Sequence, residues 1–232
     1  MKNVIELPWD QIHDQLNTRG HAHVSNLLTP TECNSLIEVY PQENIYRNVI
    51  SMEQYRFGKG EYKYFHYPLL PLITQIRTDF YGHLSALANR WMKALSLILE
   101  YPPDHAAFIK QCHAAKQVRP TPLILKYETG GFNTLHQDLY GDVYFPFQIV
   151  LVLTEPDRDH KGGELVFTDQ LPRGQSKATV VTPHQGDAVI FTTNYRPVQG
   201  IKGYYKARMK HGISEVTAGT RYACGIIFHD AA

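Results

Sequence analysis

Apolar residues recur every three to four positions in the first half of the chain, which predicts amphipathic helices. The first stripe consists of Trp9, Ile12 and Leu16, with Pro8 suited to its first turn. The run TPTE at residues 29–32 has the pattern of a capping box, so we expect a helix from Pro30 to about Tyr40. The longest stripe extends from Ile73 to Leu95 and predicts a long helix packed on the core.

From Thr121 onward the period changes to two, and short runs rich in β-branched and aromatic residues alternate with turn residues. The runs are PLILKY, TLHQDL, FPFQIVLVLT, GELVFT, ATVVT, DAVIFT and RYACGIIF. Many short strands at this spacing favour a sandwich or jelly-roll barrel over a parallel α/β sheet. We therefore expect an α+β protein with a single domain over residues 1–232. Residues 1–118 are expected to form a mainly helical layer and a candidate substrate lid, and residues 119–232 the β core.

Composition indicates the size of the core, the kind of partner and the cellular compartment to expect. Of the 232 residues 43% are hydrophobic, enough for one sizeable core. The net charge of +1 argues against a strongly electrostatic partner, although a local basic patch remains compatible with it. The three cysteines are widely spaced and form no CxxC motif, which favours a reducing compartment. No apolar run predicts a signal peptide or a membrane span, so we expect a cytoplasmic protein without a membrane partner.

The segment LHQDLYGD places His136 and Asp138 two positions apart, in what looks like the start of a strand. Residues i and i+2 of a strand point to the same face, so the imidazole and the carboxylate are expected to share one space. His211 lies downstream in the β-rich half and completes a set of two histidines and one carboxylate. Such a set holds Fe(II) on one face and leaves the opposite positions open.

Arg221 follows His211 by ten residues, inside an otherwise apolar run. A guanidinium there can grip a carboxylate with two parallel hydrogen bonds, as a dicarboxylic cosubstrate requires. An HxD pair alone is a weak signal in a chain with 12 histidines. However, His136 is the only histidine followed two residues later by Asp, and His211 is the only one followed ten residues later by Arg. The conjunction of the two features is a strong signal.

The HxD pair, the distal histidine and the following arginine resemble the iron- and 2-oxoglutarate-dependent dioxygenases, whose fold is a double-stranded β-helix. The similarity extends to FGKGEYKYFHYPL, RPTPLILKY, LHQDLYGD, FPFQIVLVL, GGELVF, RPVQG, KHGIS and IIFHDA. These segments resemble a bacterial family of such oxygenases that is described as acting on damaged DNA and is related to the alkylated-DNA-repair dioxygenases. The resemblance implies Fe(II), 2-oxoglutarate and O2 as cofactor and cosubstrates. It implies His136, Asp138 and His211 as iron ligands, and Arg221 as the partner of the distal carboxylate of 2-oxoglutarate.

Two further residues are candidates for cosubstrate binding. Tyr127 stands where many members of the superfamily place a strand residue that hydrogen-bonds the same carboxylate, but it is equally suited to packing inside the barrel. Gln148 interrupts the apolar run FPFQIVLVL, and a buried amide must find partners. It either contributes to cosubstrate binding or satisfies a backbone group.

The substrate is predicted from the segment YRFGKGEYKYFHY at residues 55–67, which interleaves aromatic and basic side chains. The candidate contact residues are Arg56, Lys59, Tyr62, Lys63 and Tyr64. Exposed aromatic faces beside cations suit stacking of nucleic-acid bases and contact with phosphates. The alternative is a two-stranded hairpin whose aromatic residues pack on the barrel. A second basic run, Lys202, Lys206, Arg208 and Lys210, leads into His211 and is either a phosphate contact or a solvated strand face.

These observations predict an Fe(II)- and 2-oxoglutarate-dependent dioxygenase that carries out oxidative demethylation or hydroxylation, with damaged, alkylated nucleic acid as the candidate substrate. Hydroxylation of an N-methyl carbon gives a hemiaminal that releases formaldehyde. Two alternatives stay open: a hydroxylase of a protein side chain or small molecule with the same iron site, and a non-enzymatic metal-binding jelly roll. Arg221 argues against the latter, since a bare metal site has no need of a cosubstrate clamp. The oligomeric state is left open.

Overall fold

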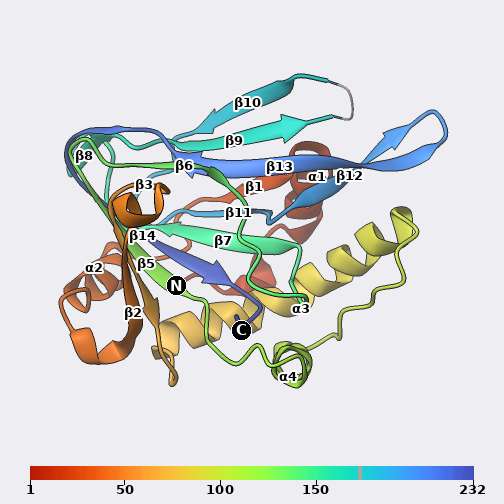
Figure 1. The fold of residues 1–232 in the computed structure, drawn as a ribbon, viewed down its shortest axis with the longest axis horizontal. Helices are drawn as coiled ribbons and strands as arrows, with labels where there is room; N and C mark the ends of the chain where they lie inside the picture. Colours follow the sequence, from red (N-terminus) through yellow and green to blue (C-terminus); the bar gives the residue numbers. More distant parts are fainter. Residues whose placement is uncertain (172–173) are drawn as a thin grey trace.

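The computed structural model of the chain describes residues 1–171 and 174–232. Its first half contains four α-helices in the described residues (Figure 1), which are α1 (Trp9–Arg19), α2 (Pro30–Glu38), α3 (Pro71–Ala94) and α4 (His105–Ala114). Short 3-10 turns also occur, namely η1 (Val4–Glu6), η2 (Glu43–Ile45) and η3 (Met52–Tyr55).

The helices begin and end where local chemistry favours it. In α1, Pro8 precedes the first turn and Gly20 ends the helix in the left-handed region at φ 74°. The predicted capping box of α2 is confirmed: the Thr29 hydroxyl accepts from the Glu32 backbone N–H, and the Glu32 carboxylate accepts from the Thr29 backbone N–H. The predicted apolar stripe of α3 is buried from Ile73 to Met92.

The larger sheet is antiparallel and has eight strands in the described chain. In spatial order they are β1 (His21–Val24), β11 (Ala188–Thr192), β7 (Phe147–Val152), β14 (Val216–Ile227), β5 (Leu123–Glu128), β4 (Glu61–Phe65) and β2 (Tyr46–Ser51), with β8 (His160–Gly162) paired to β14. Helix α3 lies along the outer face of this sheet (Figure 1). Strand β7 is buried along its whole length because one of its faces meets the helices and the other meets the second sheet.

The smaller sheet has six strands in the described chain. They are β10 (Ser176–Val181), β9 (Leu165–Gln170), β13 (Gly203–Ile213), β6 (Phe132–His136) and β3 (Gly58–Lys59), with β12 (Tyr195–Gly200) paired to β13. One apolar cluster joins the sheets, with Val150, Val189 and Phe191 of the larger packed against Phe167 and Met209 of the smaller. Two antiparallel sheets packed face to face confirm the predicted jelly-roll class.

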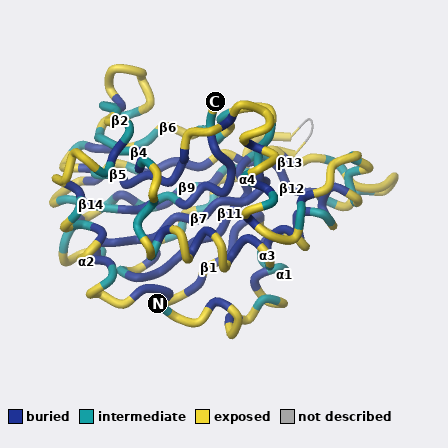
Figure 2. Tube along the Cα trace, turned by 90° about the horizontal axis from the view of Figure 1, so that it is seen from below, coloured by how far each residue is buried: buried dark blue, intermediate teal, exposed yellow. Residues whose placement is uncertain are grey.

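Burial follows this layering. In Figure 2 the tube is buried along the inner strands β7 and β11, and exposed at the projecting hairpins. A larger cluster fills the space between the helices and the outer face of the eight-stranded sheet, and includes Phe80, Leu84 and Trp91 of α3. The α3 stripe therefore packs on the core, as predicted. No helix in the described part of the chain is long and apolar enough to cross a membrane.

The structure differs from the sequence-based expectation in the first half of the chain. Residues 1–118 contribute four strands to the sheets as well as the helices, so the β core is not confined to residues 119–232. Residues 58–65 do not form a hairpin, because β3 pairs with β6 in the smaller sheet whereas β4 pairs with β5 and β2 in the larger one. This segment crosses from one sheet to the other.

Candidate metal centre

Two neighbouring strands bring the candidate metal ligands together. His136 is the last residue of β6, and the β6–β13 register places it directly opposite His211. Their ring centroids are 4.2 Å apart. Asp138 lies beyond the end of β6, so the segment is the end of a strand and not the start that the sequence suggested, but the two side chains share one space as expected. The connection is fixed by Gln137, whose amide donates to the backbone carbonyl oxygens of Asn194 and Met209.

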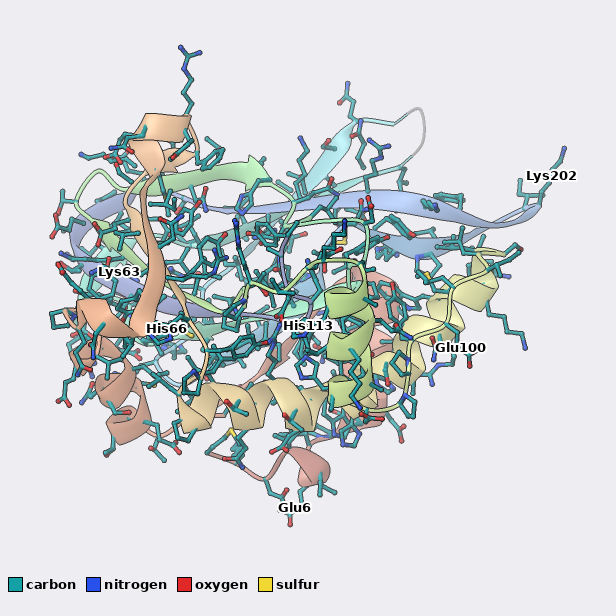
Figure 3. All side chains as sticks on the ribbon, turned by 60° about the horizontal axis from the view of Figure 1, so that its bottom comes forward. Glu6, Lys63, His66, Glu100, His113 and Lys202 are labelled. Carbon is teal, nitrogen blue, oxygen red and sulfur yellow. The ribbon has the colours of Figure 1, made fainter. Side chains whose placement is uncertain are left out.

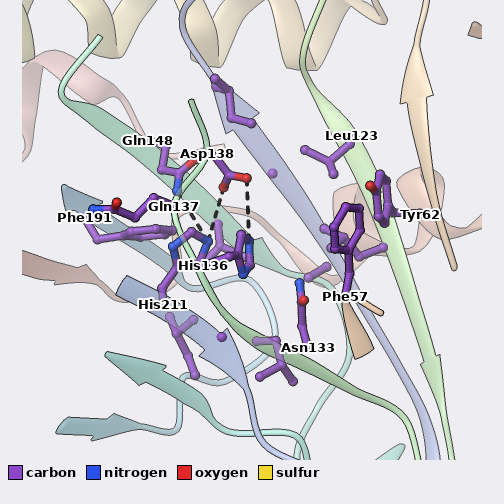
Figure 4. Close-up of a pocket in the computed structure, with 18 of the residues that line it drawn as sticks. Phe57, Tyr62, Leu123, Asn133, His136, Gln137, Asp138, Gln148, Phe191 and His211 are labelled. Carbon is purple, nitrogen blue, oxygen red and sulfur yellow. Dashed lines mark hydrogen bonds and ion pairs between the residues drawn. The ribbon is translucent and has the colours of Figure 1, made fainter. Parts of the chain in front are cut away.

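The three side chains converge on one point, with one ligand atom of each lying within 4.8 Å of the others (Figure 4). His136 Nε2 is 3.6 Å from Asp138 Oδ1, and His211 Nε2 is 3.2 Å from Asp138 Oδ2. Metal–nitrogen and metal–oxygen bonds of about 2 Å fit inside such a triangle. The donor set of two imidazoles and one carboxylate is the set that Fe(II) oxygenases use.

Neighbouring groups orient these ligands. His136 Nδ1 lies 2.7 Å from the Thr134 carbonyl oxygen, to which it can only donate, so the Nε2 lone pair faces the site. The Tyr140 hydroxyl donates to Asp138 Oδ1 at 2.7 Å. Gln148, from β7, brings its Nε2 to 3.5 Å from His211 Nε2. The residues present therefore fit a bound divalent metal in both ligand identity and orientation.

The pKa values of Asp138 and His211 are shifted towards the protonation states that bind a metal. Burial raises the pKa of Asp138, but its interactions with His136, His211 and Tyr140 outweigh this effect, and the net pKa lies well below its usual range. The pKa of His211 is lowered by burial and by His136, against the opposing effect of Asp138. An ionised carboxylate and a neutral imidazole are the forms that bind a metal.

The three candidate ligands lie in a pocket of about 220 Å³ between the two sheets. Its walls are mainly aromatic and aliphatic, and they include Phe57, Tyr62, Leu123 and Phe191 (Figure 4). Arg221 is the only lysine or arginine among the described residues that line it. The pocket therefore offers one fixed positive charge besides a metal.

Arg221 extends from β14 into this pocket and is 2% exposed. Its Cζ lies 5.7 Å from the centroid of the Tyr127 ring. Burial lowers the pKa of the guanidinium, and Nη1 has no hydrogen-bond partner among the residues that the structure describes. Gly163 is required beside it, since a Cβ there would lie 2.7 Å from Arg221 Cδ. A buried cation without a protein carboxylate suits an anionic ligand.

Tyr127 and Gln148 both line the pocket. Tyr127 is fully buried, and its hydroxyl accepts from Asn133 Nδ2 at 3.5 Å. Gln148 is 2% exposed and shares a face of β7 with Val150, which points between the sheets. Tyr140 was missed by sequence reasoning, although its place two residues after Asp138 was a signal of the same kind as the HxD spacing.

The candidate contact residues of the 55–67 segment point in different directions. Tyr62 and Tyr64 line the pocket, whereas Lys63, on the opposite face of β4, lies 4.2 Å from the centroid of the Tyr40 ring and donates to the Tyr40 carbonyl oxygen (Figure 3). Tyr64 is only 8% exposed, so its ring offers little free surface for base stacking. Arg56 is exposed at a left-handed position, and Lys59 contacts the Thr129 carbonyl oxygen at 3.4 Å. Neither lines the pocket as the structure describes it.

The second basic run is also turned away from the metal ligands. Lys206, Arg208 and Lys210 are exposed on β13, on the face opposite to His211, because side chains alternate along a strand. Lys202 lies at the tip of the β12–β13 hairpin (Figure 3). This placement favours the solvated strand face over a phosphate contact beside the metal ligands.

Comparison with known proteins gives the family. Residues 60–231 match the family described as "Oxygenase, catalysing oxidative methylation of damaged DNA". The chain belongs to this oxygenase family. An uncharacterized protein of Mycobacterium tuberculosis, found in strains CDC 1551 / Oshkosh and H37Rv, is 41% identical to the oxygenase over 165 residues, which cover 71% of each chain. The resemblance seen in the sequence motifs is thereby confirmed.

Solved structures show the same fold. A Pseudomonas putida prolyl-4-hydroxylase has a TM-score of 0.56 and 15% identity to the oxygenase, over 97% of this chain and 99% of its own. A Trichoplax adhaerens prolyl hydroxylase, in complex with a hypoxia inducible factor peptide fragment, has a TM-score of 0.57 and 16% identity, with 96% and 89% covered. A Burkholderia pseudomallei oxidoreductase of the 2OG-Fe(II) oxygenase family has a TM-score of 0.56 and 14% identity, with 98% and 94% covered. The predicted double-stranded β-helix is confirmed.

Proposed function

We propose that the oxygenase is an Fe(II)- and 2-oxoglutarate-dependent dioxygenase. His136, Asp138 and His211 hold the iron, and Arg221 binds the distal carboxylate of 2-oxoglutarate. The observation that carries this proposal is that one pocket contains both the three-residue ligand set and a buried guanidinium without a carboxylate partner among the described residues. A site that only stored or sensed a metal would have no use for the buried arginine.

The pocket residues have different roles in the proposed reaction. Iron, when bound, supplies the activation of O2 against a C–H bond. Arg221 gives 2-oxoglutarate its orientation through paired N–H donors, and a dicarboxylate neutralises the buried charge. Tyr127 and Gln148 offer further polar contacts at the pocket wall. The apolar strand residues around them keep water out, which strengthens each of these electrostatic contacts.

For the substrate we propose alkylated nucleic acid, from which a methyl group is removed by hydroxylation of its carbon and release as formaldehyde. The family description supports a DNA substrate. Phe57 and Tyr62 at the pocket wall supply ring faces against which an extruded base can stack, and Tyr55 stacks on Phe57 with 5.5 Å between centroids. Phe57 and Tyr55 are 46% and 54% exposed, as a stacking surface requires.

A second candidate is hydroxylation of a protein side chain or a small molecule. The observation that favours it is the shortage of positive charge at the pocket, where Arg221 is the only described lysine or arginine that contacts the cavity. A nucleic-acid groove is normally lined by several cations that meet phosphates. The solved prolyl hydroxylase from Trichoplax adhaerens, which holds a peptide, shows that this fold accommodates such a substrate.

Product analysis separates these candidates. The iron-loaded oxygenase is incubated with 2-oxoglutarate, O2 and panels of methylated oligonucleotides, peptides and metabolites, and succinate and formaldehyde are quantified. We expect substrate-dependent succinate with formaldehyde from a methylated oligonucleotide, and neither product from Asp138→Ala. Succinate without formaldehyde, together with a mass gain of one oxygen in a peptide or metabolite, would select the second candidate. No succinate with any panel and no iron binding would contradict the dioxygenase proposal.

A further inference from the structure

We infer that Tyr140, oriented by Tyr64, is a positioning residue that makes Asp138 bind the metal through one oxygen only. The inference rests on the proposed function and adds to it two tyrosines outside the ligand set. Both line the same pocket as the ligands. Their hydroxyls form a chain in which Tyr64 lies 3.1 Å from Tyr140, and Tyr140 lies 2.7 Å from Asp138 Oδ1.

The donor and acceptor in each of these hydrogen bonds follow from which groups carry a proton. An ionised Asp138 carries no proton, so it can only accept, and the Tyr140 hydroxyl proton must point at Oδ1. The Tyr140 oxygen is then free to accept from Tyr64. Oδ1 is thereby engaged, and Oδ2, which is 3.2 Å from His211 Nε2, remains for the metal.

Neighbouring side chains pack against both tyrosine rings. Arg47 Cζ lies 4.4 Å from the centroid of the Tyr64 ring, and the Tyr62 and Tyr64 rings form a T-shaped pair with 5.4 Å between centroids. The Tyr140 ring packs against the buried ring of His229, with 5.9 Å between centroids. The hydroxyl chain therefore has little freedom to leave Asp138.

Denticity matters because of the number of coordination positions. A roughly octahedral Fe(II) site offers about six positions, of which two histidines and a single carboxylate oxygen take three. A chelating 2-oxo acid takes two more, which leaves one position. If both oxygens of Asp138 bound the metal, the protein and the cosubstrate would fill the site. By donating a hydrogen bond to the second oxygen of Asp138, Tyr140 thus keeps one coordination position of the iron free.

The test is anaerobic titration of the metal-free protein with Fe(II), followed by titration with 2-oxoglutarate, monitored by calorimetry and by visible absorption of the Fe(II)–2-oxoglutarate complex. Removal of such an outer hydrogen bond typically weakens metal binding by about 10- to 100-fold. We expect a loss in that range for Tyr140→Phe, a smaller loss for Tyr64→Phe, and a shifted absorption band with weaker 2-oxoglutarate binding in Tyr140→Phe. A purely structural role would not shift the band.

Tyr144→Phe is the matched control, since the Tyr144 hydroxyl donates to that of Tyr195 at 3.1 Å in another tyrosine pair that does not reach Asp138. It should bind the metal as the wild type does. If the wild type binds Fe(II) and 2-oxoglutarate, and Tyr140→Phe shows the same metal affinity and an unshifted band, the inference is overturned but the proposed function is not. Failure of the wild type to bind Fe(II) would overturn the proposed function with it. If Tyr140→Phe melts far below the wild type, Tyr64→Phe decides by the same two readouts.

Discussion

Replacing Arg221 with Met should make the ligand-free oxygenase more stable and, at the same time, insensitive to 2-oxoglutarate. The side chain is 2% exposed, and its Nη1 lacks a hydrogen-bond partner in the described residues. A buried donor left without a partner costs about 1–3 kcal/mol. The lost cation–π contact with Tyr127, at 5.7 Å, subtracts about 0.5–1 kcal/mol from the gain. The net increase in the free energy of unfolding is then about 0–2.5 kcal/mol.

Thermal unfolding measures this effect. For a chain of this size, each kcal/mol moves the melting temperature by about 2–4 °C, so the variant should melt above the wild type without ligand, by up to about 10 °C. With Mn(II) bound to prevent turnover, 2-oxoglutarate at about 100 times its Kd should stabilise the wild type by about 2.7 kcal/mol and the variant hardly at all.

Arg196→Met is the matched control, because Arg196 is also buried but has a carboxylate partner, Asp169, at 2.6 Å. Its removal leaves that carboxylate unpaired, so this variant should lose stability while keeping its response to 2-oxoglutarate. A ligand-free Arg221→Met that melts below the wild type, or that gains as much from 2-oxoglutarate, would refute the reasoning.

Three further predictions concern the metal, the cosubstrate pocket and the buried ion pair. Asp138→Ala should fold but lose stoichiometric iron, measured by metal analysis after desalting; full retention would contradict the ligand set. Gly163→Ala should weaken 2-oxoglutarate binding in calorimetry, because the φ of +71° and the 2.7 Å approach of the added Cβ to Arg221 Cδ both strain the site; unchanged affinity would contradict this. The pKa of Asp230 is lowered, since Arg77 at 2.7 Å and other hydrogen bonds outweigh its burial. Its contribution to stability is therefore complete above the unfolded value of about 3.9 and is lost as pH falls through the lower folded value. Urea unfolding across that acidic range should show this loss in the wild type and a flatter profile in Asp230→Asn; equal profiles would count against it.

The parts of the fold that local patterns determine were predictable. The capping box of α2 and the stripe of α3 depend on neighbours within a few turns, and both elements are present. The spacing of His136 and Asp138 predicted that they meet, although the reason given was incomplete. Asp138 reaches the site because Gln137 anchors the loop to Asn194 and Met209, and such long-range contacts leave no local trace in the sequence.

The directions of the side chains in residues 55–67 could not be predicted from the sequence. Its aromatic and basic residues were visible, but their directions depend on which sheet each half joins. Strand β4 enters the larger sheet with Tyr62 and Tyr64 inward and Lys63 outward over Tyr40. Composition alone cannot assign these faces, because a shift of one residue in strand register would exchange them.

The crossing of this segment between the sheets has a consequence for how the protein can diversify. Backbone hydrogen bonds fix β3 to one sheet and β4 to the other, so the positions of Phe57 and Tyr62 are set by the main chain. The candidate metal ligands belong to β6, β13 and the loop after β6. The side chains at Phe57 and Tyr62 can therefore be exchanged by mutation without moving the candidate metal ligands. Relatives that accept different substrates could arise through a few substitutions there, while the chemistry stays the same.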